Sequence, residues 1–140
     1  MRLATFNLEI VSVEESIFNG EVNRLFAIGS QGNLEILAGH APLLTELLPG
    51  AIWYADKFAK ETAVVILGGF LEVQPKKTIL LADAAVRASE IDVAMATKAK
   101  AQAQEMLAAK KGEIDFGKIN AELAMAVAQL QLIKKLRKGK

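Results

Sequence analysis

The sequence contains no cysteine and only one histidine among its 140 residues. The absence of cysteine excludes disulfide bonds, thiolate zinc sites and cysteine nucleophiles. Because His40 is the single histidine, a histidine metal site or a catalytic triad would have few components to draw on. We therefore expect no catalytic residue and no metal site.

Long apolar runs are also missing. The longest, from Ala63 to Leu71, is about half the length of a membrane span and contains Gly68-Gly69. The first residues, Met1 to Asn7, lack the apolar stretch of a secretory signal. We expect neither a transmembrane helix nor a secretory leader.

The residues that are present divide into two parts of different composition. Residues 1–87 hold seven Lys/Arg, ten Asp/Glu, all three prolines and seven of the eight aromatic residues. Residues 88–140 hold ten Lys/Arg, six Asp/Glu and twelve alanines. This change indicates two structural units, which we place at 1–87 and 88–140.

The first part has the period-two pattern of β-strands, as in Phe6, Leu8 and Ile10. Further apolar stretches recur about every ten residues, at 22–28, 34–37, 51–54, 63–67, 70–73 and 78–82. Turn signals lie between them, at Asn19-Gly20, Ser30 to Asn33, Pro49-Gly50 and Gln74 to Lys77. The pattern predicts an antiparallel β-sandwich or barrel.

The second part has the pattern of two helices. We expect one over about 90–111, capped by Ser89 and stopped by Gly112, and one over about 116–136, capped by Asp115. The second helix carries one apolar stripe, formed by Ile119, Leu123, Val127, Leu130 and Ile133. A short connection predicts an antiparallel hairpin, and the fold class is α+β.

The apolar side chains that the first helix can bury are mostly small, namely Ala96, Ala99, Ala103, Met106 and Leu107. A buried methyl group contributes about 0.8 kcal/mol, against about 1.5–3 kcal/mol for a whole leucine. Two helices held in this way are marginal alone. We expect the hairpin to need a second surface, either the β unit or another protein.

Two glycine-containing segments of the β unit have structural interpretations. Gly29 to Asn33 lies between two predicted strands, so it is read as a hairpin turn and not as a phosphate loop. Gly68-Gly69 lies in an apolar strand, where glycine marks a bulge or a close backbone approach.

The C-terminal segment from Lys134 to Lys140 has five cations and no anion. It is read either as a solvated helix end or as a site for an acidic protein patch, an anionic membrane or nucleic acid. The segment has no aromatic residue and the β unit is net acidic, which disfavours nucleic acid. A free-standing nucleic-acid or membrane-binding module stays as the alternative function, and an enzyme that uses His40 is a second rival.

Several segments resemble the epsilon subunit of F-type rotary ATP synthases. The resemblance rests on 32–45 (Gly-Asn-Leu-Glu-Ile-Leu-Ala-Gly-His-Ala-Pro-Leu-Leu-Thr), on 68–73, on 81–92 and on 122–130, and it covers the whole chain in order. It implies a β-sandwich of about ten strands followed by a helical hairpin. It further implies a non-catalytic rotor subunit on the cytoplasmic face of the bacterial inner membrane, peripheral to it, in proton-driven ATP synthesis.

The resemblance also implies partners for each unit. The sandwich is expected to bind the gamma subunit through His40, Leu43 and Thr45, and to face the membrane c-ring through the loop Ser30, Gln31, Gly32 and Asn33. The hairpin is expected to block ATP hydrolysis by extending toward the alpha and beta subunits. The cations that would meet acidic beta-subunit segments there are Lys134, Lys135, Arg137 and Lys138.

Some bacterial relatives bind ATP through an Ile/Leu-Asp-x-x-Arg-Ala motif at the start of the first helix. The matching residues here are Ile91, Asp92, Met95 and Ala96. Met95 stands where the motif has arginine and offers no donor to a phosphate. We therefore expect ATP binding to the isolated chain to be weak or absent, with no other cofactor.

Overall fold

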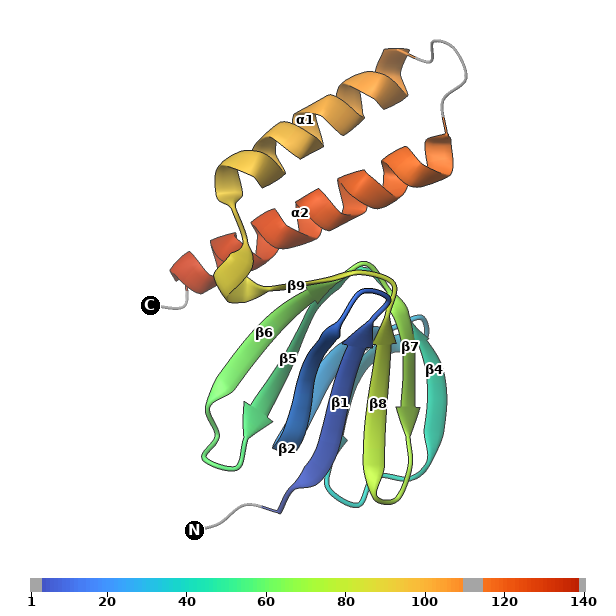
Figure 1. The fold of residues 1–140 in the computed structure, drawn as a ribbon, viewed down its shortest axis with the longest axis vertical. Coiled ribbons are helices and arrows are strands. Elements are labelled where there is room, and N and C mark those ends of the chain that lie inside the picture. The colour runs from blue at the N-terminus through green and yellow to red at the C-terminus, as the bar shows by residue number, and fades with distance from the viewer. Residues whose placement is uncertain (1–3, 110–114, 139–140) are drawn as a thin grey trace.

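The computed structural model describes residues 4–109 and 115–138, in which nine strands precede two helices (Figure 1). The strands are β1 (Phe6–Ser12), β2 (Ser16–Gly29), β3 (Gly32–Leu37), β4 (Leu43–Leu47), β5 (Gly50–Asp56), β6 (Glu61–Ile66), β7 (Gly69–Val73), β8 (Lys77–Ala82) and β9 (Ala85–Arg87). A 3₁₀ turn, η1 (Ala88–Glu90), leads to α1 (Val93–Ala109) and α2 (Phe116–Lys138). The predicted order of a β-sandwich followed by two packed helices is confirmed.

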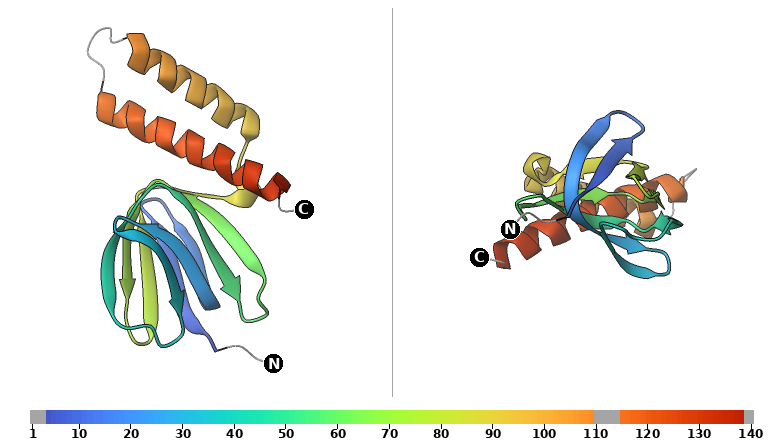
Figure 2. Two further views of the ribbon diagram at one scale, coloured as in Figure 1. Left: turned by 180° about the vertical axis from the view of Figure 1, so that it is seen from behind. Right: turned by 90° about the horizontal axis from the view of Figure 1, so that it is seen from below.

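The strands wrap around one core in the order β1-β8-β7-β4-β2-β5-β6-β9, with β3 on β2 and a further pairing of β1 with β2 (Figures 1 and 2). β2 joins the two layers because Phe18 to Val22 pair with β1, whereas Arg24 to Gly29 pair with β3. The side chains that alternate inward are almost wholly buried, among them Leu8, Ile10, Leu25, Ile36, Ile52, Ile66, Leu71 and Leu80. This apolar core makes the sandwich a rigid support for its surfaces.

The predicted sandwich of about ten strands is confirmed, with nine strands in the described residues. Two details differ from the prediction, and the first is that the predicted pattern contained neither β4 nor β9. The pairing of β1 with β8 is parallel, while all other pairings are antiparallel. The short length of β9 and the Pro42 just before β4 obscured these strands in the sequence pattern.

The predicted turn at Asn19-Gly20 is wrong, because both residues lie inside β2, opposite Glu9 and Leu8 of β1. A Cβ atom on Gly20 would lie 3.0 Å from the ring of Phe18. That ring stacks on Tyr54 with its centroid 4.4 Å away. Gly20 therefore makes room for an aromatic pair, a use of glycine that local sequence does not distinguish from a turn.

The predicted close backbone approach at Gly68-Gly69 is confirmed. Gly69 begins β7 with φ +147°, and a Cβ atom there would overlap the carbonyl oxygen of Leu81 on β8. Ser30 and Gln31 form the predicted turn between β2 and β3, where Gly29 pairs with Gly32. Both segments have the backbone roles that glycine allows.

The helix starts agree with the sequence in one case out of two. The carboxylate of Asp115 accepts the Lys118 N–H at 3.1 Å, so the predicted cap of α2 is confirmed. The predicted Ser89 cap is wrong, because Ser89 lies in η1 and Asp92 caps α1 by accepting the Met95 N–H at 3.1 Å. Gly112, expected to stop the first helix, lies outside the described residues.

The hairpin rests on the sandwich through α2, and α1 packs on the other side of α2 (Figure 1). Of the predicted α2 stripe only Ile119 is fully buried, and the other buried residues are Ala126, Ala128 and Leu132. The buried residues of α2 do not form one stripe, because one side of the helix packs on α1 and another on β5 and β6. Ala128 and Leu132 pack on Ala63 and Val65 of β6, which is thereby covered on both faces.

Candidate interaction surfaces

The outer face of β4, β7 and β8 carries large apolar side chains that the described residues leave exposed. Leu44 is 70% exposed, Phe70 is 51% exposed and Leu81 is 53% exposed. Phe70 pairs with Leu81, and Leu44 pairs with Glu72, the residue two positions along β7 from Phe70. Diagonal neighbours at this spacing lie within reach of one another, so the three side chains form one patch. We call Leu44, Phe70 and Leu81 the outer-face patch.

Exposed apolar residues gathered in this way are typical of protein-binding sites. Acidic residues flank the patch, because Glu46 lies opposite Phe70 and Glu72 lies opposite Leu44. The surface therefore combines an apolar centre with a negative rim. Sequence reasoning missed these residues, although outward positions on paired strands are the signal that identifies them once the register is known.

The predicted segment with His40, Leu43 and Thr45 lies at the start of β4, next to this patch. Leu43 packs against the sandwich core, and Thr45 shares its side of the strand, whereas Leu44 and Glu46 face outward. Nδ1 of His40 lies 2.6 Å from the Ala41 carbonyl oxygen, to which it donates. The structure thus brings the three predicted residues into one segment and turns the side chains of β4 alternately inward and outward.

The predicted polar loop, residues 30–33, is exposed to solvent. Ser30, Gln31, Gly32 and Asn33 are all exposed, and a Cβ atom at Gly32 would meet nothing within 4 Å. The Ser30 N–H donates to the Glu46 carbonyl at 2.9 Å, which ties the turn to β4. The turn is therefore a fixed, uncharged and polar projection.

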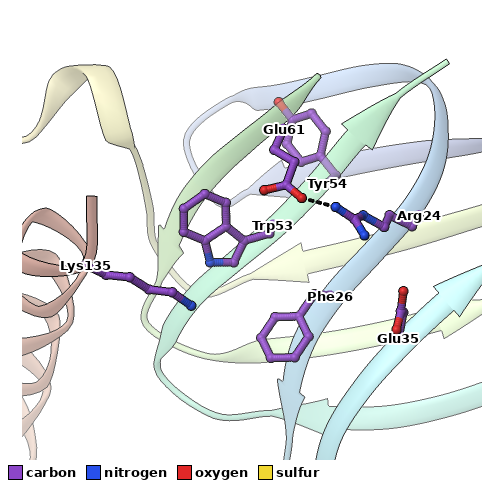
Figure 3. Close-up of a pocket in the computed structure, with 7 residues that line it drawn as sticks. All are labelled: Arg24, Phe26, Glu35, Trp53, Tyr54, Glu61 and Lys135. Atoms are coloured by element: carbon purple, nitrogen blue, oxygen red, sulfur yellow. Dashed lines mark hydrogen bonds and ion pairs between the residues drawn. The ribbon is translucent and has the colours of Figure 1, made fainter. Parts of the chain in front are cut away.

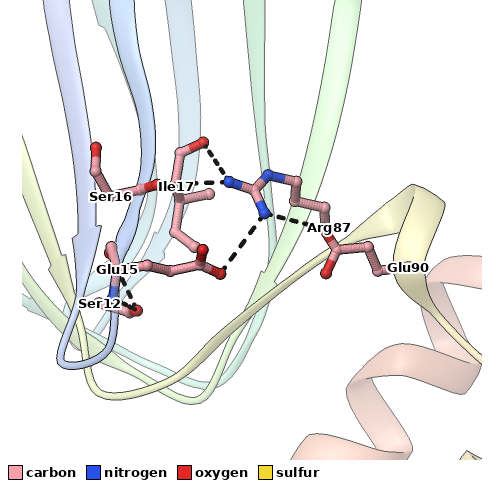
Figure 4. A network of polar contacts seen from close by, with 6 residues as sticks. All are labelled: Ser12, Glu15, Ser16, Ile17, Arg87 and Glu90. Atoms are coloured by element: carbon pink, nitrogen blue, oxygen red, sulfur yellow. Dashed lines mark hydrogen bonds and ion pairs between the residues drawn. The ribbon is translucent and has the colours of Figure 1, made fainter.

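Arg87, the last residue of β9, fixes the connection between the sandwich and the helices (Figure 4). Its guanidinium donates to the Ile17 carbonyl at 3.0 Å and pairs with Glu90 at 2.9 Å and Glu15 at 3.6 Å. The hydrogen bond to Glu90, together with the nearby carboxylates, raises the pKa of Arg87 further above its usual range. The β1–β2 loop, β9 and η1 thus meet at one side chain.

The basic end of α2 lies beside the outer face of β5. Nζ of Lys135 is 5.4 Å from the centroid of the Trp53 ring. Lys135 is nevertheless exposed, as are Lys134, Arg137 and Lys138. Lys135 and Trp53 line a hollow of about 290 Å³ together with Phe26, and Glu61 at its far side pairs with Arg24 (Figure 3). Of the four predicted cations, one is thus engaged within the chain.

A second hollow, of about 400 Å³, lies between α1 and α2 and includes three of the four ATP-motif positions. Asp92, Met95 and Ala96 line it, and Ile91 packs instead against the cluster under α2. Met95 is 68% exposed. The other lining residues include Glu90 and Glu122, and in the described part of the chain this lining has no lysine or arginine.

Comparison with known proteins places the chain in a family. The model for the ATP synthase delta/epsilon chain β-sandwich domain matches residues 5–88, and that for the long α-helix domain of the same chain matches 89–134. The ATP synthase epsilon chain of Chromohalobacter salexigens is 45% identical over 135 residues, which cover 96% of each chain. This chain belongs to the ATP synthase delta/epsilon family. Its members of the epsilon type are non-catalytic subunits of ATP synthase.

Solved structures share the fold of this epsilon-family chain. One is a chain of the Euglena gracilis mitochondrial ATP synthase, with a TM-score of 0.74 and 24% identity over 97% of this chain and 84% of that one. Another, from the central stalk and c-ring of the Tetrahymena thermophila mitochondrial ATP synthase, has a TM-score of 0.52 and 14% identity over 64% and 72%. At these identities the likeness concerns the architecture alone.

The helices and the acidic residues of this epsilon-family chain limit what its described part can hold or cross. None of the described helices combines the length and apolarity needed to cross a bilayer. Among residues 4–109 and 115–138, no group of three or more His, Asp or Glu side chains is arranged to hold a metal ion.

Proposed function

We propose that this chain is a central-stalk subunit that couples the gamma subunit to the c-ring during proton-driven ATP synthesis, and that its helices inhibit ATP hydrolysis. The observation that carries the proposal is the match to an ATP synthase epsilon chain, 45% identical over 96% of both chains. As a peripheral subunit, the chain would work at the cytoplasmic face of the bacterial inner membrane.

The sandwich offers two surfaces for these partners. The outer-face patch supports a permanent protein contact, because apolar side chains with exposures of 51–70% gain stability when a partner covers them. We assign this patch, with the adjoining segment of His40, Leu43 and Thr45, to gamma. The exposed turn of Ser30, Gln31, Gly32 and Asn33 is assigned to the polar loops of the c-ring. None of these four residues is charged, so the proposed contact would be made by polar groups alone.

The hairpin is held weakly enough to leave the sandwich and to inhibit ATP hydrolysis from a second position. Few side chains hold it on the sandwich, since Ala128 and Leu132 are the buried α2 residues of the contact with β6. When released, its helices would extend toward the alpha and beta subunits. Lys134, Lys135, Arg137 and Lys138 would then meet acidic beta-subunit segments, an attraction that salt would partly screen.

The hollow between α1 and α2 supports the expectation of weak ATP binding. Glu90, Asp92 and Glu122 line it, and their charges repel a nucleotide triphosphate. Asp92 is already used as the cap of α1, and Met95 supplies no phosphate donor. We propose that the isolated chain has no resident nucleotide or other cofactor.

The gamma contact can be tested by co-purification of the full chain with a gamma partner and the membrane rotor. Leu44→Asp places a charge in the outer-face patch and should greatly reduce recovery of gamma. Phe58→Asp is the matched control, because Phe58 is 79% exposed on the turn between β5 and β6, at the end of the sandwich away from the helices (Figure 1). Equal recovery from both variants, or no gamma with the parent chain, would contradict the assignment.

The inhibitory role can be tested in the assembled enzyme. Deleting residues 134–140 should raise ATP hydrolysis while leaving coupling largely intact, and deletion from Ser89 should raise it further. Binding of the purified chain to DNA or anionic vesicles that is lost with the same deletion, without any change in hydrolysis, would favour the free-standing binding module instead.

A further inference from the structure

Four residues form the buried centre of the contact between α2 and the sandwich, and partly buried residues surround it, among them Met125 of α2 and Trp53 of β5. Its buried members are Ala128 and Leu132 on α2 and Ala63 and Val65 on β6. Three of these four residues have side chains of three carbons or fewer. The free energy that holds α2 on the sheet is therefore limited. An interaction at the edge of the contact can thus change the equilibrium between docked and undocked α2.

Trp53 lies at that edge. It is on β5, directly opposite Ala63, and packs against the same cluster. Its ring is only partly covered, so part of the indole face remains open toward the hollow that Phe26 and Lys135 line (Figure 3). If α2 left the sheet, the Trp53 ring would become more exposed.

Lys135 reaches the open part of the ring from α2. It follows Leu132 by three residues, so it lies one turn further along on a neighbouring side of the helix. Its Nζ is 5.4 Å from the ring centroid, within the range of a cation–π interaction. Two carboxylates line the same hollow, and neither forms an ion pair with Lys135: Glu61 is paired with Arg24, and no ion pair joins Lys135 to Glu35 among the described residues. The indole is thus the partner that the ammonium group meets.

We propose that Lys135 and Trp53 form a clasp that determines how firmly α2 is held on the sheet. The clasp adds a directional contact between two elements whose buried contact is otherwise made by Leu132 and three smaller side chains. Removing either member shifts the equilibrium toward the undocked helix, while the sandwich core is untouched because Trp53 points away from it. The consequence for ATP hydrolysis rests on the proposed function, but the clasp itself is a property of the isolated chain.

The absence of cysteine allows a direct test. Ala128→Cys places a single thiol under α2, where the residue is 5% exposed, and a thiol reagent reaches it only when α2 lifts. In this background we expect Lys135→Gln to raise the labelling rate about two- to five-fold, the effect of losing one partly exposed cation–π contact. Lys135→Arg should keep the parent rate. Lys134→Gln removes the neighbouring exposed charge and should also leave the rate unchanged.

A second variant identifies the ring as the partner. Trp53→Leu should raise the labelling rate, and adding Lys135→Gln to it should cause no further increase. If Lys135→Gln leaves the rate at the parent value, or Lys134→Gln raises it equally, the clasp is refuted. Additive effects of Trp53→Leu and Lys135→Gln would also refute it. Should the cysteine perturb docking, amide exchange of α2 in the cysteine-free chain makes the same comparison.

The consequence for the enzyme is measured separately. If labelling confirms the clasp in the isolated chain, the proposed function predicts that Trp53→Leu, which leaves all cations of α2 in place, increases the inhibition of hydrolysis in the assembled enzyme. A change in labelling without a change in hydrolysis contradicts the inhibitory role and leaves the clasp standing. No change in labelling contradicts the clasp, whatever hydrolysis does.

Discussion

Replacing Leu132 by alanine should release the helices without unfolding the sandwich. Leu132 is 2% exposed and is the largest α2 side chain buried against β6. The substitution removes three carbon groups, each worth about 0.8 kcal/mol, so docking weakens by about 2.4 kcal/mol. That is roughly a 60-fold shift toward the undocked state. The sandwich core keeps its stability because none of its buried residues contacts this position.

Hydrogen exchange measured segment by segment separates the two outcomes. A hairpin of this composition is marginal once undocked, so α2 amides should exchange roughly 60-fold faster, while β7 and β8 amides keep the parent rate. Leu136→Ala, at a position 37% exposed near the end of α2, is the control and should have a much smaller effect. Equal acceleration in α2 and in the strands would refute the reasoning, because hairpin and sandwich would then unfold as one unit.

Three further predictions concern other parts of the chain. Burial is the largest cause that raises the pKa of Tyr54 above its ordinary value of 10.0, so the absorbance of its phenolate should appear only above that pH. The free energy of unfolding that the neutral phenol contributes is present below pH 10.0 and should fall as the pH rises through the raised pKa. Titration of Tyr54 at the ordinary pKa would contradict this. Gly69→Ala should lower the free energy of unfolding in urea by about 3 kcal/mol or more, because the new Cβ atom would overlap β8 and the positive φ is unfavourable for alanine. Gly117→Ala, the control, should be neutral or slightly stabilising. Equal effects of the two substitutions would contradict this account. Calorimetry should give a dissociation constant for ATP above the millimolar range with the parent chain. Met95→Arg should bind ATP more tightly than the parent chain, whereas Met106→Arg, the control, should bind it as the parent does. A millimolar or lower dissociation constant for the parent chain would contradict the interpretation of the motif.

Features set by neighbouring residues could be predicted from the sequence. Asp115 caps α2 because a carboxylate at that position reaches an amide three residues on, which is a local geometry. The turn at Ser30 and Gln31 is local in the same sense. At the start of α1, two residues could serve as the cap, and only the path of η1 decided for Asp92 over Ser89.

Features set by distant residues could not be predicted in this way. Gly20 is small because Phe18 stacks on Tyr54, a contact between strands that the local pattern does not contain. The outer-face patch depends on the register of β4, β7 and β8. Before that register is known, Leu44 and Leu43 are equally good candidates for the surface.

The anchoring of Arg87 limits where the helices can travel. Because its guanidinium holds both the Ile17 carbonyl and the Glu90 carboxylate, the backbone before Ile91 stays with the strands when α2 departs. The pivot is then at Ile91 and Asp92, and an α1 of 17 residues measures about 25 Å along its axis. Under the proposed function, the released helices turn about this fixed point, and any subunit that they contact must lie within the distance set by the lengths of α1 and α2.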